Sequence, residues 1–255
     1  DLHSFPTRRS SDLPGYHPDA LGARNNLASA YKSAGRLDEA IDLYEHILAD
    51  CRRILSPDHP DIFIFRDNLA DAYRKAGELD RTTDLYEQNL DDRLRALGPD
   101  HPDTLAARNN LAGAYHESDR PDKAIPLFEH NLTSRERVLG PDHPDTLTSR
   151  NNLAGAYESA GRLEQAIDLF EQTLSDRLRV LGPDHPGTLA SRNNLALAYE
   201  SAGRLDEAIG LYEQNLADCE RFLNSDHPYI EAFRDNLADA YRAVGRDEDA
   251  EALLD

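Results

Sequence analysis

The sequence predicts an all-α fold, an α-solenoid in which antiparallel helix hairpins stack on one another. Two periodic observations predict it. The dipeptide His-Pro recurs every 42 residues, and the tripeptide Asn-Leu-Ala recurs in step with it. A fixed period of this length is typical of arrays in which each repeat is one small helical unit. The His-Pro pairs lie at 17–18, 59–60, 101–102, 143–144, 185–186 and 227–228.

These positions define the expected domain organisation. We expect one repeat array over residues 14–255, with five whole repeats and a partial sixth. The repeats lie near 17–58, 59–100, 101–142, 143–184, 185–226 and 227–255.

The repeat over residues 143–184 shows how each hairpin is expected to form. The proline after His143 suits the first turn of a helix, where a missing N–H costs little, and Asp142 or His143 can cap that helix. Gly161 supplies the left-handed residue that ends it. A second helix follows, with apolar residues at spacings of three and four, and Gly182 ends it. One hairpin cannot bury its apolar stripe alone, so neighbouring repeats must stack.

Some positions within the repeats carry expectations of their own. Repeat 2 has Thr82 where the other repeats have Ala, and we expect looser packing there. Pro126 lies early in the second helix of repeat 3, where we expect a local bend. The periodic tyrosines, such as Tyr157, have core spacing. Acidic residues of the second helix, such as Asp168 and Glu171, are expected on a solvated outer face.

The N-terminal segment differs from everything that follows. Residues 1–13 read DLHSFPTRRSSDL and contain no apolar period. This string resembles the translation of a common sequencing adapter, so we expect a disordered assembly artefact; the alternative is a real targeting or flexible tail. The chain also lacks Met and stops within the sixth repeat, so we expect a fragment of a longer reading frame.

The composition narrows the class of partner. The chain has 48 acidic and 28 basic residues, for a net charge of −20. Such a chain repels phosphate backbones, so we expect no nucleic-acid partner. No run of about 18 apolar residues occurs, so no membrane partner is expected either. The predominance of Arg over Lys is typical of GC-rich bacterial DNA.

The two cysteines, Cys51 and Cys219, lie 168 residues apart, which is four periods. Stacked repeats hold these positions several layers apart, whereas a disulfide needs Cα atoms within about 7 Å. We therefore expect two free thiols, which fits a reducing, cytoplasmic location. A metal or redox pair is the alternative.

The repeats contain no catalytic signature. The patterns GxxxxGK[ST], HExxH, CxxC and GxSxG are absent, so we expect no enzyme and no cofactor. A zinc site needs three or four ligands within about 2 Å of the metal. Adjacent repeats lie roughly 10 Å apart, so capping is expected and a metal ladder is the alternative. This applies to the periodic histidines His59, His101, His143, His185 and His227.

The repeat resembles the tetratricopeptide repeat. That pattern has a Leu, a small residue and a Tyr, then Gly, Ala and an aromatic residue. Repeat 4 has Leu153, Ala154, Tyr157, Gly161, Ala166 and Phe170. The 42-residue period, the NNLA core and the linker LGPDHPDTL resemble the kinesin light chain subclass. They also resemble bacterial signalling arrays, some of which are fused to STAND-type NTPases.

This resemblance implies a right-handed superhelix whose first helices line a concave groove for a protein or peptide. A ladder of Asn amides there can hydrogen-bond an extended peptide backbone whatever its side chains are. The alternative for the second Asn of each pair is that it braces the neighbouring hairpin. The candidates are Asn25, Asn26, Asp67, Asn68, Asn109, Asn110, Asn151, Asn152, Asn193 and Asn194. Further groove positions are Asn236, Asp71, Asp235, Asp239, Lys32, Arg74, Lys75, His116, Glu158, Glu200 and Arg242.

The chain departs from the family three residues before the motif Leu, where the family usually has a large apolar residue and every repeat here has Arg. Arg presents a planar fork that matches carboxylates, so capture of an acidic peptide is one interpretation. The alternative is that each stem packs between helices while the head pairs with a nearby Asp or Glu. The candidates are Arg108, Arg150 and Arg192, and the other members are Arg24, Arg66 and Arg234.

We therefore expect a protein-interaction scaffold that binds a peptide or partner protein in this groove. The alternative function is a sensor or regulatory arm of a larger STAND-type signalling NTPase. In that case, the NTPase domain would lie elsewhere in the full-length protein.

Overall fold

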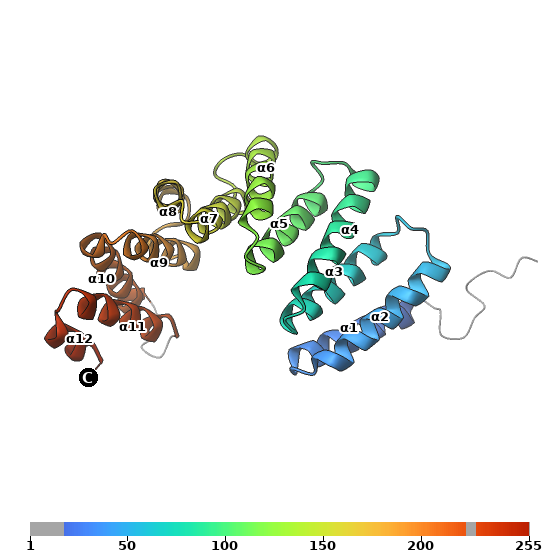
Figure 1. Cartoon of the computed structure of the whole chain (residues 1–255), viewed down its shortest axis with the longest axis horizontal. Coiled ribbons are helices and arrows are strands. Elements are labelled where there is room, and N and C mark those ends of the chain that lie inside the picture. The colour runs from blue at the N-terminus through green and yellow to red at the C-terminus, as the bar shows by residue number, and fades with distance from the viewer. Residues whose placement is uncertain (1–17, 223–227, 255) are drawn as a thin grey trace, which may run out of the picture. The chain divides into compact units, whose positions relative to one another are not determined.

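The structure is a computed structural model that describes residues 18–222 and 228–254. Every regular element in these ranges is a helix (Figure 1), which confirms the predicted all-α class. Residues 1–13, for which an artefact is predicted, lie outside the described residues. His17 and His227 do too.

The chain divides into two compact units, residues 1–120 and 121–255, and each is described by itself. The first unit contains α1 (Pro18–Ser33), α2 (Leu37–Ile54), α3 (Pro60–Lys75), α4 (Leu79–Leu97) and α5 (Pro102–Glu117). The second contains α6 (Pro121–Leu139), α7 (Pro144–Ser159), α8 (Leu163–Leu181), α9 (Pro186–Ser201), α10 (Leu205–Phe222), α11 (Pro228–Ala243) and α12 (Asp247–Leu254). We call the odd-numbered helices helix A of their repeat and the even-numbered ones helix B.

The periodic histidines cap helix A. The imidazole Nδ1 accepts a hydrogen bond from the backbone N–H two residues later, and proline fills the next position. The N···N distance is 3.2 Å at His59, His101 and His143 and 3.0 Å at His185. This bond satisfies one of the free N–H groups at the start of a helix. The prediction that these histidines cap helices is confirmed at the four described positions.

The turn inside each hairpin needs a left-handed residue. Gly161 has φ of 72°, and the N–H of Arg162 donates to the carbonyl oxygen of Tyr157 at 2.8 Å. This is the helix-ending geometry predicted for Gly161. Repeat 3 makes the same turn with Asp119 at φ of 53°, because a short Asp side chain tolerates this region better than most residues do.

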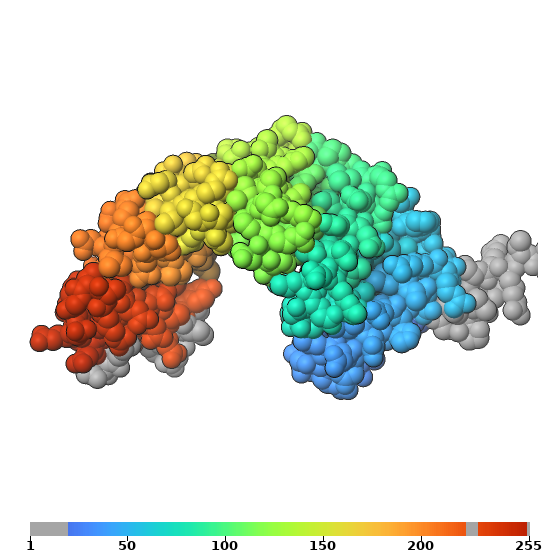
Figure 2. All heavy atoms as spheres, viewed as in Figure 1, coloured from blue at the N-terminus to red at the C-terminus, as the bar shows by residue number. Residues whose placement is uncertain are grey.

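Within each unit, helix B packs against its own helix A and against the next one. In the second unit, α8 lies between α7 and α9 (Figure 1), and consecutive hairpins are in direct contact (Figure 2). The facing side chains are buried, including Phe170 of α8 and Leu189 of α9.

A periodic hydrogen bond joins neighbouring repeats. In α3, α5, α7, α9 and α11, the buried Tyr donates its hydroxyl hydrogen to a Glu of the preceding helix B, 28 residues earlier. Glu171 is exposed, as predicted, but it also accepts this bond from Tyr199 at 2.6 Å. The pairs are Tyr73–Glu45, Tyr115–Glu87, Tyr157–Glu129, Tyr199–Glu171 and Tyr241–Glu213.

Three local predictions can be checked against these helices. Thr82 is fully buried, and its hydroxyl donates to the carbonyl oxygen of Glu78 at 3.0 Å. Looser packing of the two helices at this position stays a prediction. Helix α6 runs through Pro126 without interruption, and a bend there stays a prediction. Cys51 and Cys219 are free, buried thiols, as predicted.

Candidate peptide-binding surface

The paired asparagines of helix A bond to one another between repeats. The Nδ2 of Asn68 donates to the Oδ1 of Asn25 at 2.8 Å. In the second unit, Asn194 donates to Asn151 at 3.2 Å and Asn236 donates to Asn193 at 2.8 Å. The second Asn of one helix A thus meets the first Asn of the preceding helix A, 43 residues earlier. These three pairs have the bracing geometry that the sequence left open as an alternative.

Each Asn–Asn bond leaves hydrogen-bonding capacity unused. A carboxamide has two N–H donors and one oxygen that can accept two bonds. The first Asn of each pair uses its oxygen, so its amide nitrogen stays available, as in Asn151 and Asn193. The second Asn uses its nitrogen, so its oxygen stays available, as in Asn194. The surface formed by helix A therefore offers donors and acceptors in alternation, with the amide planes held in place.

The arginines of helix A point away from this surface into the hairpin. Arg150 is buried, and its guanidinium pairs with Asp176 at 2.6 Å and Glu136 at 3.3 Å. Arg192 is buried in the same way and pairs with Asp218 at 2.9 Å. This is the geometry of the alternative in which the heads pair with nearby carboxylates. Capture of an acidic peptide by these arginines stays a prediction.

Arg108 is also buried, at 3% exposure, and burial lowers the pKa of its guanidinium. Its Nη1 atom has no hydrogen-bond partner. Arg108 therefore shares the buried placement of Arg150 and Arg192 without an ion pair of the same kind among the described residues.

The first unit contains a break in the Asn ladder. Repeat 2 has Asp67 where the other first-unit repeats have the first Asn. Both carboxylate oxygens of Asp67 bind helix B of the same repeat, at 2.6 Å to Asn89 and 2.6 Å to Arg93. Asn110, which follows Asp67 by 43 residues, is exposed and makes no ladder bond to it among the described residues.

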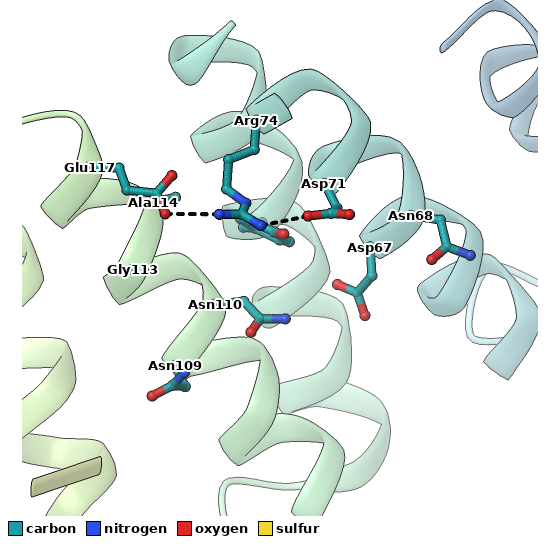
Figure 3. A pocket seen from close by; sticks show the side chains of 10 residues that line it. Asp67, Asn68, Asp71, Arg74, Asn109, Asn110, Gly113, Ala114 and Glu117 are labelled. Atoms are coloured by element: carbon teal, nitrogen blue, oxygen red, sulfur yellow. Dashed lines mark hydrogen bonds and ion pairs between the residues drawn. The ribbon is translucent and has the colours of Figure 1, made fainter. Parts of the chain in front are cut away.

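A hollow of about 410 Å³ lies at this break, between α3 and α5. Figure 3 shows Asp67, Asp71 and Arg74 on α3 facing Asn110 and Glu117 on α5 across the open space. Arg74 spans the rim, at 2.7 Å from Asp71 and 2.9 Å from Glu117. The lining residues are Asp67, Asn68, Asp71, Arg74, Tyr86, Asn109, Asn110, Gly113, Ala114 and Glu117.

The pKa values of the two aspartates of the hollow are shifted in opposite directions. Burial raises the pKa of Asp67 above its usual value, although Arg93 and Asn89 act against this. Burial also acts to raise the pKa of Asp71, but hydrogen bonds from Lys32 and Arg74 outweigh it and the pKa lies below the usual value. Lys32 lies 2.6 Å from the Asp71 carboxylate. Asp67 is thus the carboxylate with less compensation for its burial.

The helix A surface of the second unit differs in charge. Glu158 and Glu200 occupy the position of Lys32 and Arg74 in the first unit. Burial raises the pKa of Glu200, which accepts a hydrogen bond from the Tyr212 hydroxyl at 3.1 Å. Repeats 4 and 5 of the second unit therefore have carboxylates at this position, whereas repeat 6 has Arg242, which pairs with Asp239 at 2.8 Å as Arg74 does with Asp71.

Sequence reasoning missed four residues of the hollow: Tyr86, Gly113, Ala114 and Glu117. A signal for Glu117 was present, because Arg74 precedes it by the same 43 residues that separate bonded asparagines. Gly113 has nothing within 4 Å of the position that a side chain would take, so its lack of a side chain leaves this part of the hollow open.

The fold and this surface define a helical-hairpin repeat protein. A model of the tetratricopeptide repeat family matches residues 64–130, 107–178, 175–217 and 193–255, and a second model of that family matches residues 20–61. The chain belongs to the tetratricopeptide repeat family, as its motif predicted. This is a family of repeats rather than a catalytic family, and its fold supports a role in protein interaction. No curated protein sequence matches the chain.

Solved structures place it beside kinesin light chain-like members. A kinesin light chain-type protein of Podosopora anserina with nearly identical TPR-like repeats is 32% identical, with a TM-score of 0.74 over 82% of this chain and 99% of that one. BtubC (BKLC) of P. vanneervenii is 23% identical, with a TM-score of 0.67 over 92% of this chain and 88% of that one. A STAND protein of Pyrococcus horikoshii with a tetratricopeptide repeat sensor shares the fold at 13% identity, with a TM-score of 0.71 over 96% of this chain and 36% of that one.

Two kinds of feature are absent from the residues that the structure describes. No helix among them is long and apolar enough to cross a membrane. No group of three or more His, Cys, Asp or Glu side chains in those ranges is placed to hold a metal ion.

Proposed function

We propose that the chain is a protein-interaction scaffold that binds an extended peptide along the helix A surface of each unit. The observation that carries this proposal is the Asn–Asn bond between repeats. It orients the amides, so the free nitrogen of Asn151 and the free oxygen of Asn194 need no reorganisation when a partner binds. A peptide backbone alternates C=O acceptors and N–H donors, which these amide atoms complement.

The repeat spacing suits an extended peptide. Packed helices of adjacent repeats lie roughly 10 Å apart, and an extended chain rises about 3.3 Å per residue. Each repeat therefore covers about three peptide residues. The three helices A of the second unit, α7, α9 and α11, would engage a nonapeptide through its backbone.

A selection from a displayed nonapeptide library, followed by affinity measurement, tests the proposal. The test variant is Asn151→Ala/Asn193→Ala, which removes the first amide of two ladder pairs. Loss of about two net hydrogen bonds should weaken binding roughly tenfold or more. The matched control is Gln172→Ala/Gln214→Ala, which removes two exposed carboxamides from helix B. Equal affinity of the two double variants for every selected peptide would contradict the proposal.

A second candidate function is the sensor arm of a larger signalling protein. It is motivated by the likeness in fold to the tetratricopeptide repeat sensor of the STAND protein. The reading frame that surrounds this chain tests it: an adjoining nucleotide-binding P-loop would support this function, and a complete reading frame without one would exclude it.

A further inference from the structure

The hollow between α3 and α5 is lined by a buried tyrosine whose hydroxyl group has no partner among the described residues. Tyr86 is 5% exposed and lines the hollow, and no hydrogen bond of its hydroxyl is present among the described residues. The tyrosines at the same position of other repeats do have partners. Tyr44 bonds to Ser29 at 2.8 Å and Tyr212 to Glu200 at 3.1 Å. The Tyr86 hydroxyl is therefore left to bond with a group that enters this space.

A second free group faces the same space from the other helix. Asn110 lies on α5 and is exposed, and its amide has no protein partner among the described residues. The cause is Asp67, whose oxygens are both turned to Asn89 and Arg93. The break in the ladder thus leaves a whole carboxamide free, where an unbroken ladder would use its nitrogen.

The unused capacity of the hollow is mainly acceptor capacity. The carboxylates of Asp67, Asp71 and Glu117 can each accept about four hydrogen bonds, and the structure gives them only one or two each. Arg74 is the one cation in the lining, and both of its terminal nitrogens are already bound to carboxylates. Lys32 and Arg93 pair with Asp71 and Asp67 from outside the lining. A ligand for this space must therefore bring hydrogen-bond donors, and cationic donors bind carboxylate oxygens most strongly.

We infer that this hollow receives the guanidinium group of an arginine side chain from the peptide that binds the helix A surface. The inference rests on the proposed function and names the side chain that the first unit selects. A guanidinium offers five N–H donors in one plane, whereas an ammonium offers three from a point. The planar group can donate in several directions at once, which suits a space with acceptors on both α3 and α5. The raised pKa of Asp67 agrees with this assignment, because an added cation would compensate the burial of its carboxylate.

The space itself depends on one residue. Gly113 has nothing within 4 Å of the position of an added side chain, so a larger residue there would fit the helix and fill the hollow. Gly155 occupies the same position in repeat 4 and is equally open. The pair Gly113→Leu and Gly155→Leu therefore gives a blocking variant and a matched control with the same helix substitution.

The experiment uses the whole chain and three short probes that differ in one side chain. They are the peptides acetyl-Gly-Ser-X-Ser-Gly-amide with arginine, citrulline or glutamate at X. Citrulline has nearly the shape of arginine without its charge. NMR titration follows the side-chain amides of Asn110 and Asn151 and the ring of Tyr86.

The expected result is a saturable shift at Asn110 and Tyr86 with the arginine peptide, with binding weaker by roughly tenfold or more for citrulline because charge-assisted hydrogen bonds are lost. Gly113→Leu should abolish that shift, and Gly155→Leu should retain it. Tyr86→Phe should weaken binding by a few-fold without a change in the folded spectrum. Equal binding of arginine and citrulline, no shift at Asn110, or a retained shift in Gly113→Leu would overturn the inference.

Failure of this inference is distinguishable from failure of the proposed function. The affinity of selected nonapeptides for Asn151→Ala/Asn193→Ala tests the Asn ladder. Their affinity for Gly113→Leu tests the hollow alone. If selected peptides lose affinity only with the ladder variant, the scaffold function stands and the arginine assignment is wrong.

Discussion

The junction between α2 and α3 and the junction between α8 and α9 occupy the same place in the repeat but contain different chemistry. The first is apolar, with Cys51 and Phe65 in one buried cluster. At the corresponding positions, the second has Arg177 and Ser191, joined by a hydrogen bond of 2.7 Å. The Arg177 guanidinium also donates to the carbonyl oxygen of Gly187 at 2.7 Å.

Two combinations of a small and a large residue fill the same space between helix B and the following helix A. A small helix B residue faces a large helix A residue in the apolar junction, and the order is reversed in the polar one. The chain repeats the apolar pair as Cys219 and Phe233, four repeats after Cys51 and Phe65. Since a helix B with Cys is followed by a helix A with Phe, and a helix B with Arg by a helix A with Ser or Ala, the two kinds of junction cannot exchange one partner alone.

The largest expected effect comes from emptying the apolar junction. Phe65 is 5% exposed, and Phe65→Ala should lower the free energy of unfolding by about 3–5 kcal/mol, because it leaves a cavity among buried side chains. Ser191→Ala at the same position of the polar junction should cost only about 1 kcal/mol, the value of one hydrogen bond. Denaturant unfolding of both variants measures the difference, and equal costs would contradict the comparison.

Exchange of one residue pair tests whether the two junctions are alternatives. Ser191→Phe should destabilise by about 2–3 kcal/mol, because it overpacks the junction and displaces Arg177 from its acceptor. Arg177→Cys/Ser191→Phe rebuilds the apolar pair and should recover at least half of that loss. If the double variant loses as much stability as the two single variants together, the two substitutions do not compensate for each other.

Alkaline pH should weaken the apolar junctions through their thiols. Burial raises the pKa of Cys51 and Cys219 from 9.0 to about 11. The folded state therefore holds the thiol protons more tightly, so the contribution is fully present below pH 9.0 and is lost as pH rises toward 11. The loss is at most about 1.4 kcal/mol per thiol for each pH unit.

The measurement is the stability of the chain and of Cys51→Ala/Cys219→Ala at several pH values in this window. Other groups that titrate in this window are common to both proteins, so their contributions cancel in the difference. A stability difference that does not change with pH would contradict the assignment of buried, protonated thiols.

The smallest effect concerns a hydroxyl beside the polar junction. Thr188 is fully buried and its Oγ1 has no partner, whereas the apolar junctions have Ile62 and Ile230 at this position. Thr188→Val should raise the free energy of unfolding by about 1 kcal/mol, because an unpaired polar group is removed. The melting temperature, measured by thermal unfolding, should rise accordingly. Thr173→Val is the control, since the Thr173 hydroxyl donates to the carbonyl oxygen of Leu169 at 2.7 Å and its removal should bring no gain.

The sequence predicts the local features of this fold well. The His143 cap and the Gly161 turn depend on a few neighbouring residues whose types allow little else. The 42-residue period then requires stacking, because each hairpin leaves its apolar stripe uncovered. Helix positions, the core tyrosines and the free thiols follow from these facts.

The candidate surface was only partly predictable, because it depends on how neighbouring helices are rotated. The rotation of α9 relative to α7 decides whether the Asn194 side chain contacts Asn151 or solvent, and the sequence left both alternatives open. The hollow arises because Asp67 turns toward Arg93, which lies on the other helix of its repeat. That choice depends on distances between side chains and not on any local pattern.

The central claim is that the Asn ladder binds a peptide through its backbone. The most direct measurement compares the affinity of a selected nonapeptide with that of two modified forms, one with a methyl group on a central backbone nitrogen and one with the same residue changed to Ala. Methylation removes a donor to an Asn oxygen, so it should weaken binding roughly tenfold or more, whereas the change to Ala should have little effect. Binding that survives methylation at every position but depends on side chains would contradict it.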